Sequence, residues 1–128
     1  MSEDEVCGIR VASRKDVMSG IVKAASGGLL AKMRYHKINA RRHTREVKDY
    51  TVVPLDCGMS KDGRNIVLYA EDFGQEGHRQ VKMFFLRQIE EFVPTDRQVR
   101  PSFDIKVDRI MRFTGVGRNM EDAGNEQE

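Results

Sequence analysis

The sequence predicts a mainly β protein with one N-terminal helix, folded as a small antiparallel barrel of five or six strands. Three observations support this fold class. A single helical pattern precedes residue 29, short apolar stretches of strand length recur after it, and turn residues separate these stretches. Short strands joined by turns favour a closed or nearly closed barrel, because closure removes exposed strand edges.

The length and composition are those of one globular, strongly solvated domain. The chain has 128 residues, of which 39% are hydrophobic and 33% are charged. We expect a single domain over residues 7–118, with disordered acidic tails at residues 1–6 and 119–128. No stretch approaches the roughly 18 apolar residues of a membrane span, and the acidic start lacks the apolar run of a signal peptide. These features predict a cytoplasmic protein without membrane contact.

The charges are unevenly distributed along the chain. The net charge is +2, from 22 basic and 20 acidic residues. Seven of the acids lie at the two ends, at Glu3, Asp4, Glu5, Glu121, Asp122, Glu126 and Glu128. Residues 6–120 therefore hold 13 acids against all 22 basic residues and carry a net charge of +9. A basic body of this kind suggests a polyanionic partner, with which the acidic ends could compete.

A helix is predicted over residues 14–26. Ser13 and Asp16 have the spacing of a capping box, apolar residues then recur at helical spacing, and the pair Gly27–Gly28 ends the helix. Residues 7–12, which precede the helix, are partly apolar and could form a short first strand.

Residues 29–38 predict the next strand, because its odd-numbered residues up to Tyr35 are apolar and can face a core. Residues 39–48 are polar and basic without periodicity, so we expect a loop or a mobile hairpin tip there. A second strand is expected over residues 49–56, in which Pro54 requires an edge or a bulge.

The pair Asp62–Gly63 predicts a hairpin turn before a strand over residues 66–72, which has almost no polar interruption and should be central. Its partner is expected at residues 79–85, after a turn at residues 73–78. Residues 86–89 predict a short helical turn, and residues 90–94 resume extended structure. A last strand is predicted over residues 102–110 from strict alternation, which Ile110 breaks unless it starts a new segment.

The predicted core combines one face of the helix with the apolar positions of the strands. Phe84 and Phe85 are consecutive, so one of them should face outward, and the sequence does not indicate which one. The predicted core residues are Val17, Ile21, Leu30 or Met33, Val52, Val67 or Leu68, Phe84, Leu86 and Ile89.

The order of these segments, from Arg34 to Arg118, resembles the WYL domain, a small Sm-like β-barrel found mainly in bacterial and phage regulators. The resemblance rests on an apolar skeleton: a tyrosine late in one strand, an apolar residue and a proline in the next, the leucine of the naming triplet, and a later phenylalanine, leucine and isoleucine. The matching residues are Tyr35, Val52, Pro54, Leu68, Ala70, Asp72, Phe84, Leu86 and Ile89.

Several characteristic WYL positions differ in this chain. Tyr50 stands where the family has an arginine, Ile66 and Val67 replace the tryptophan and tyrosine of the triplet, and Gln88 replaces another arginine. WYL domains bind nucleic acid or small ligands and as a rule catalyse nothing, so the resemblance implies a binding module. The winged-helix domain that usually precedes the barrel does not fit into the first 28 residues, so we expect a free-standing module.

A run of basic residues between Arg34 and Lys48 is the strongest functional feature, because only Glu46 opposes it. Such a cluster can neutralise phosphates and release their counterions. Tyr35 and Tyr50 flank the run and could stack on unpaired bases. Four further cations surround the predicted central hairpin. The predicted nucleic-acid site comprises Arg34, Tyr35, Lys37, Arg41, Arg42, Arg45, Lys48, Tyr50, Arg64, Arg79, Lys82 and Arg87.

Each part of this site has a simpler alternative. The basic run could be a solvated hairpin tip, and the four further cations could be ordinary surface charge. Tyr35 shares its strand face with Met33, and this favours a place in the core over a stacking role.

The sequence gives no sign of catalysis. Cys7 and Cys57 share no metal-ligand spacing, and a cytosolic location favours free thiols. His36, His43 and His78 have no spacing that unites them in a metal site. Cys57 has no base placed beside it. We therefore expect neither an enzyme nor a cofactor nor a bound metal.

The leading hypothesis is a nucleic-acid-binding regulatory or accessory module, which binds single-stranded DNA or RNA with low sequence specificity and could be encoded by a phage or mobile element. One alternative is an adaptor or inhibitor that binds a host protein through the barrel edge or the acidic tails. Another is a sensor of a small anionic ligand. Under each of these three hypotheses, the chain could also form a homo-oligomer.

Overall fold

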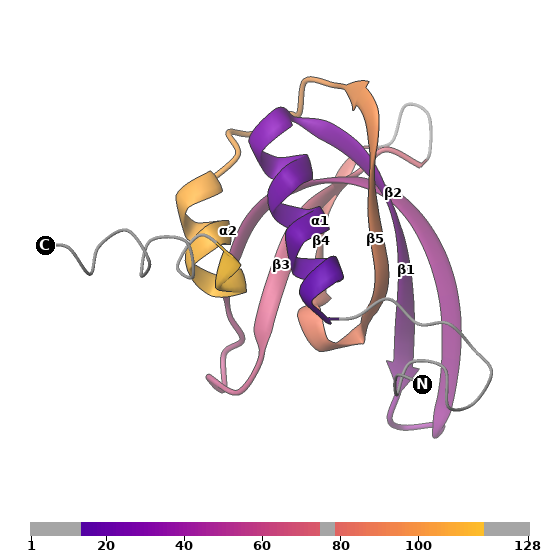
Figure 1. The fold of residues 1–128 in the computed structure, drawn as a ribbon. Helices are drawn as coiled ribbons and strands as arrows, with labels where there is room; N and C mark the ends of the chain where they lie inside the picture. The colour runs from indigo at the N-terminus through magenta and orange to yellow at the C-terminus, as the bar shows by residue number, and fades with distance from the viewer. Residues whose placement is uncertain (1–13, 75–78, 117–128) are drawn as a thin grey trace, which may run out of the picture.

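The computed structural model describes residues 14–74 and 79–116, a helix followed by strands and a short second helix (Figure 1). The elements are α1 (Arg14–Gly27), β1 (Leu29–Asn39), β2 (Thr44–Met59), β3 (Ile66–Asp72), β4 (Gln80–Phe85), the 3-10 turn η2 (Leu86–Gln88), β5 (Ile89–Gln98) and α2 (Val107–Thr114). The two predicted acidic tails, the possible strand at residues 7–12 and the predicted cap at Ser13 lie outside the described residues.

The five strands form one antiparallel sheet in the order β4-β3-β2-β1-β5. The mainly β class is therefore confirmed, and β3 lies inside the sheet as predicted. The sheet is not closed into a barrel, since within the described ranges β4 and β5 are its two edges. The turn η2 carries the chain between these edges, and the Arg14 guanidinium donates to the carbonyls of Leu86 and Ile89 there. The first residue of α1 thus contacts the turn that links the two edge strands.

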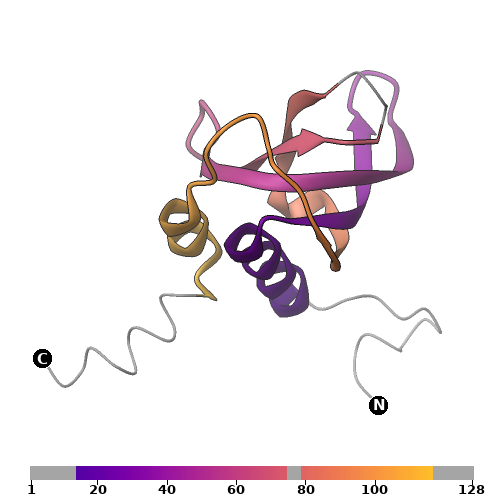
Figure 2. The same cartoon turned by 90° about the horizontal axis from the view of Figure 1, so that it is seen from above.

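Both helices lie on the same side of the curved sheet (Figure 2). Helix α1 lies close to β5 at Gly20, where an added Cβ would lie 2.3 Å from the carbonyl oxygen of Phe92. The absence of a side chain at Gly20 therefore sets the spacing between the helix and the strand. The residues predicted for the core are buried, each at most 6% exposed, and they include both members of each alternative: Val17, Ile21, Leu30, Met33, Val52, Val67, Leu68, Phe84, Leu86 and Ile89. Of the consecutive phenylalanines, Phe84 is buried and Phe85 is half-buried.

The hairpin between β1 and β2 is longer than predicted, because the loop or hairpin tip expected over residues 39–48 is confined to residues 40–43. The ladder continues to the pair Asn39 and Thr44, and only the tip is a turn. The Asn39 side chain accepts a hydrogen bond of 3.1 Å from the backbone N–H of Arg42, and His43 adopts a left-handed φ of 54°. Both faces of this hairpin are exposed. Backbone pairing therefore extends it without the apolar alternation that reveals strands in a sequence.

Strand β2 contains the bulge that Pro54 was predicted to require. Pro54 pairs with Ala70 and Asp56 pairs with Tyr69, which leaves Leu55 without a partner in the ladder. This bulge lets a proline lie in an inner strand.

The turn after β2 follows the prediction from Asp62 and Gly63. Gly63 has a φ of 71° and donates its backbone N–H to the Ser60 carbonyl at 2.9 Å. The Asp62 carboxylate accepts the N–H of Arg64 at 3.0 Å.

The strand predicted over residues 102–110 is wrong, because Val107 begins the helix α2. Val107, Ile110 and Phe113 recur every third residue and pack on the core, with Ile110 fully buried. From Val107 onward, the apolar residues therefore follow the spacing of a helix and no longer the alternation of a strand. Phe103, which alternation places inward, is 61% exposed.

The segment before α2 contacts the sheet at two points rather than pairing along an edge. Ser102 donates both its backbone N–H and its hydroxyl to the buried carboxylate of Glu71, at 2.7 and 2.6 Å. The N–H of Lys106 donates to the carbonyl of Leu55 at the bulge, at 2.7 Å. These bonds fix the start of α2 relative to β2 and β3.

Candidate nucleic-acid interface

Strands β1 and β2 project beyond the rest of the sheet as a two-stranded arm, defined here as residues 36–47 (Figure 1). Apart from the half-buried His36, all its residues are exposed. The arm carries Lys37, Arg41, Arg42 and Arg45, so much of the predicted basic run lies on an element that nothing in the described structure covers.

Cross-strand pairing sorts the residues of the arm onto two faces. Lys37 pairs with Glu46, and Ile38 pairs with Arg45. Residues directly opposite each other share a face, and neighbours along a strand point to opposite faces. Lys37 and Arg45 therefore lie on opposite sides of the arm, and the basic run does not form a single surface.

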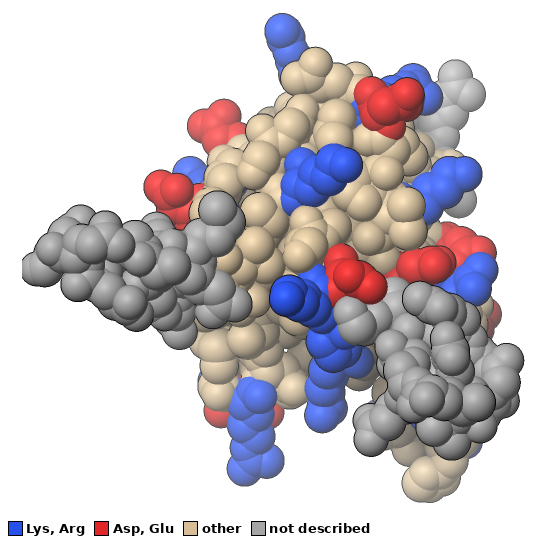
Figure 3. Space-filling view, viewed as in Figure 1, with Lys and Arg blue, Asp and Glu red and all other residues tan. Residues whose placement is uncertain are grey.

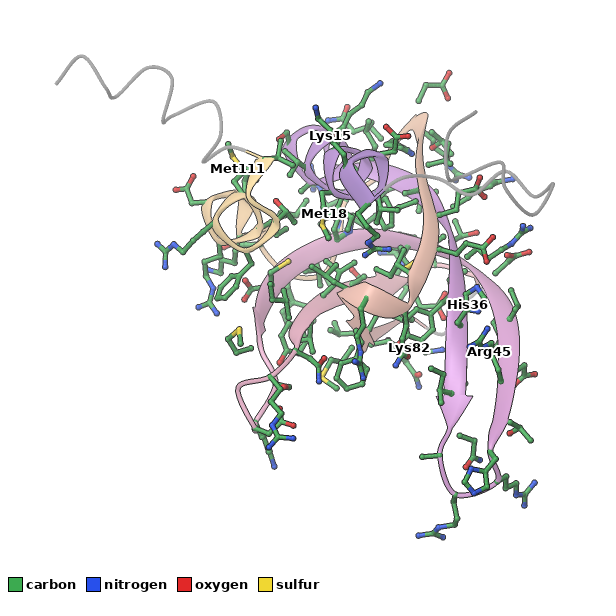
Figure 4. All side chains as sticks on the ribbon, turned by 60° about the horizontal axis from the view of Figure 1, so that its bottom comes forward. Lys15, Met18, His36, Arg45, Lys82 and Met111 are labelled. Carbon is green, nitrogen blue, oxygen red and sulfur yellow. The ribbon has the colours of Figure 1, made fainter. Side chains whose placement is uncertain are left out.

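Arg45 lies beside a hollow of about 300 Å3 at the base of the arm, which we call the Arg45 hollow. His36 and Arg45 stand next to each other on neighbouring strands at this place (Figure 4). The hollow brings together residues from α1, β1, β2, η2 and β5. Those on which its chemistry depends are Arg14, His36, Ile38, Arg45, Arg87 and Glu90.

A second hollow of about 390 Å3 adjoins the first, and we call it the Arg64 hollow. Its lining includes Arg64, Met18 and Ile66, together with Arg14 and Arg87, which line both hollows. Lys and Arg side chains gather below the first turn of α1, next to η2, in the space-filling view (Figure 3). Four arginines thus line the two hollows, and two of them are common to both.

Three of the predicted cations are engaged elsewhere in the fold. Arg34 forms an ion pair with Asp49 at 3.1 Å, and this partner raises the pKa of its guanidinium. Lys82 pairs with the largely buried Asp72 at 2.9 Å. Arg79 lies 4.3 Å from the centre of the Phe73 ring. These three cations therefore already have partners within the fold.

The two tyrosines predicted as stacking platforms belong to an aromatic cluster with Phe84. Tyr35 is 6% exposed, and its ring meets those of Tyr50 and Phe84 edge to face, at 6.4 and 5.0 Å. Burial raises the pKa of the Tyr35 hydroxyl. Tyr50 is half-buried, and the Lys82 amine lies 5.4 Å from its ring centre. The core role is therefore the one that the structure supports for Tyr35.

The only acid among the described residues that line the Arg45 hollow is Glu90, and its carboxylate contacts the Nε2 atom of His36. Each side chain is about a quarter exposed, at 26% for His36 and 25% for Glu90. This contact occupies Glu90, so the acid is not paired with the arginines of the hollow within the described ranges.

The structure brings together Arg45, Arg64 and Arg87 from the predicted site, while Arg41, Arg42 and Lys48 stay exposed on or beside the arm. Sequence reasoning missed Arg14, which it treated only as the first residue of a helix. No local signal in the sequence could have found Arg14, because its contact with η2 joins residues that are 72 positions apart along the chain.

Two features of the described residues bear on catalysis, the thiol of Cys57 and the arrangement of possible metal ligands. Cys57 is fully buried, and burial raises the pKa of its thiol to about 12, so it is a poor nucleophile. Among residues 14–74 and 79–116, no group of three or more His, Cys, Asp or Glu side chains is arranged to hold a metal ion. In the same ranges, neither helix has the length and apolar character needed to cross a membrane.

Comparison with known proteins supports the fold. No protein-family model matches the chain, and no curated protein gives a significant match. Among solved structures, the chain is similar to the proteasome accessory factor B/C (PafBC) of Arthrobacter aurescens, with a TM-score of 0.51 and 20% sequence identity. The match covers 82% of this chain and 17% of PafBC, so the chain spans a small part of that protein's length. PafBC contains a WYL domain, and the match therefore supports a WYL-like fold.

Proposed function

We propose that this chain is a nucleic-acid-binding regulatory or accessory module, which takes single-stranded DNA or RNA with little sequence preference and catalyses nothing. The observation that carries the proposal is the convergence of Arg14, Arg45, Arg64 and Arg87 on two adjoining hollows. These arginines come from α1, β2, the turn after β2, and η2. Arginines that meet from four separate segments indicate a binding site more strongly than a run of basic residues along the sequence does.

Arginine is suited to this role because its planar guanidinium can donate two parallel hydrogen bonds to phosphate. Each phosphate contact also releases counterions, which makes the affinity depend on salt. Contacts to phosphate position a strand without reading its bases, so the proposed binding has low sequence specificity.

The size and shape of the hollows favour a single strand over a duplex. Volumes of about 300 and 390 Å3 are at the lower end of the range for sites that enclose a small ligand. A flexible strand can place one nucleotide in each hollow, whereas the stacked bases of a duplex cannot separate without loss of pairing. The exposed Arg41 and Arg42 at the tip of the arm then supply further contacts to the backbone.

Binding titrations with a thymidine oligomer, its RNA counterpart and a duplex of equal length, each at two salt concentrations, test the proposal. We expect both single strands to bind more tightly than the duplex, and we expect their affinity to fall as salt rises. Absence of binding to all three ligands would overturn the proposal, and tighter binding to the duplex would overturn the preference for single strands.

An adaptor function is the second candidate, because the β4 edge of the sheet carries exposed apolar side chains. The outer edge of β4 has no partner strand in the described chain, and Val81 and Met83 on it are 43% and 49% exposed. Such an edge can pair with a strand of another protein or of a second copy. A Val81→Lys and Met83→Lys double variant should lose a protein partner, or self-association, while it keeps its affinity for nucleic acid.

A further inference from the structure

The Arg45 hollow carries more positive charge than one phosphodiester of a nucleic-acid backbone would neutralise. Among the described residues that line it, Arg14, Arg45 and Arg87 against the single acid Glu90 give a net charge of +2 around a space of about 300 Å3. We propose that this hollow receives a terminal phosphate monoester, the end group of a single strand, and that it thereby recognises strand ends. This inference rests on the proposed function and specifies which part of the strand the hollow binds.

Arg14 is held in position without a ligand. Its Nη1 and Nη2 atoms donate to the carbonyls of Ile89 and Leu86, both at 2.5 Å. A guanidinium has five N–H donors, so these two bonds leave donors for a ligand. Partial burial also lowers the pKa of Arg14, and an anion bound beside it would offset this unfavourable desolvation.

A terminal monoester matches this arrangement better than an internal diester does. A monoester carries a charge near −2 at neutral pH and offers three unesterified oxygens. An internal diester carries one negative charge and has two such oxygens. Because the described residues that line the hollow carry a net charge of +2, a dianion neutralises this charge and a diester leaves an excess positive charge.

The rest of the lining suits the nucleoside attached to the phosphate. Ile38 is 50% exposed and presents an apolar side chain, and the half-buried ring of His36 lies beside it on β1. An apolar surface and a planar ring can contact a sugar and stack on a base. The arm then extends away from the hollow towards Arg41 and Arg42, along the path that the next nucleotides would take.

The test compares thymidine oligomers that carry a 5′-phosphate, a 3′-phosphate or hydroxyl groups at both ends, each with an internal fluorescent label. We expect a phosphorylated end to tighten binding about tenfold, the effect of one strong charge-assisted contact. In the variants Arg45→Gln and Arg87→Gln this preference should disappear. The matched control Arg42→Gln, at the tip of the arm, should weaken all three oligomers equally and preserve the ratio. Thermal unfolding of each variant verifies that it is folded.

The outcomes separate the inference from the proposed function. Equal affinity for all three oligomers, with the expected salt dependence, would overturn end recognition and leave nucleic-acid binding intact. Thymidine monophosphate added as a competitor distinguishes the two sources of a phosphate monoester. If the free nucleotide binds as tightly as the phosphorylated oligomer, the hollow takes a small anionic ligand and recognition of strand ends is wrong. Weak competition by the nucleotide, together with a preference for phosphorylated strands, supports the inference.

Discussion

The hydroxyl of Tyr35 accepts a hydrogen bond of 3.0 Å from the backbone N–H of Phe85. Tyr35 lies on β1 and Phe85 ends β4, two strands that are not neighbours in the sheet. The bond therefore spans the interior of the curved sheet and fixes the end of β4, from which η2 and Arg87 continue. A residue that flanks the basic run thus belongs to the core and stabilises the fold there.

Tyr35→Phe should lower stability without changing affinity for nucleic acid. The substitution removes the hydroxyl and leaves the Phe85 N–H without its partner, at a cost of about 1–3 kcal/mol. Urea unfolding measures the loss, and titration with a single strand measures affinity. A loss of affinity with unaltered stability would show instead that Tyr35 contacts the ligand and would contradict its core role.

Gly20→Ala should destabilise the protein even though alanine is the better helix former. The new Cβ would lie 2.3 Å from the Phe92 carbonyl oxygen, so α1 must move away from β5. Overpacking of this kind costs about 1–3 kcal/mol, and the gain in helix propensity is at most about 1 kcal/mol. Ser19→Ala, on the exposed side of the same helix, is the control and should leave the melting temperature unchanged or slightly higher. Equal melting temperatures for the two variants would contradict the close approach of α1 and β5.

Cys57 should resist thiol reagents in the folded protein. Burial raises the pKa of its thiol from 9.0 to about 12, so a negligible fraction is thiolate at pH 8. In a Cys7→Ser background, we expect labelling of Cys57 only in denaturant. Because the pKa of the thiol is higher in the folded state, the unfolded state loses the proton at a lower pH. The free energy of unfolding should therefore fall as the pH rises from about 9 to about 12. Rapid labelling of the native protein at pH 8 would contradict the burial.

Leu86→Ala should cost about 2–5 kcal/mol of unfolding free energy, as truncation of a buried leucine does. Leu86 is 3% exposed and belongs to the core cluster at the start of η2. Val93→Ala is a suitable control, since Val93 is 49% exposed and should lose little. Equal losses of unfolding free energy for the two variants, measured by chemical denaturation, would mean that Leu86 of η2 does not pack in the core.

The parts of the fold that the sequence predicted well are those in which burial imposes a pattern. Helix α1, the inward face of β1 and the central β3 all pack against the core, so their apolar spacing follows the local structure. The arm has no buried face, and nothing in its composition distinguishes a paired hairpin from a loop. Phe103 and Ile105 alternate like a strand, but no sheet edge receives them, and the helical spacing from Val107 takes over.

The candidate site was harder to predict because it depends on which segments meet. The basic run was visible as a cluster of charge along the chain, yet pairing places Lys37 and Arg45 on opposite faces of the arm. Arg14 joins Arg87 only because α1 begins beside η2. Contacts of this range follow from the packing of the helix on the sheet and leave no local signal in the sequence.

The salt dependence of single-strand binding tests the central claim most directly. We would measure the slope of affinity against salt concentration for the wild-type chain and for an Arg45→Gln and Arg87→Gln double variant. A Lys23→Gln and Lys61→Gln variant, which removes two charges at exposed positions outside the hollows, is the matched control. The account predicts that the first variant lowers the slope by about 1.4, from about 0.7 for each lost phosphate contact, while the control retains the wild-type slope. An unchanged slope in the arginine variant, or an equal decrease in both variants, would contradict it.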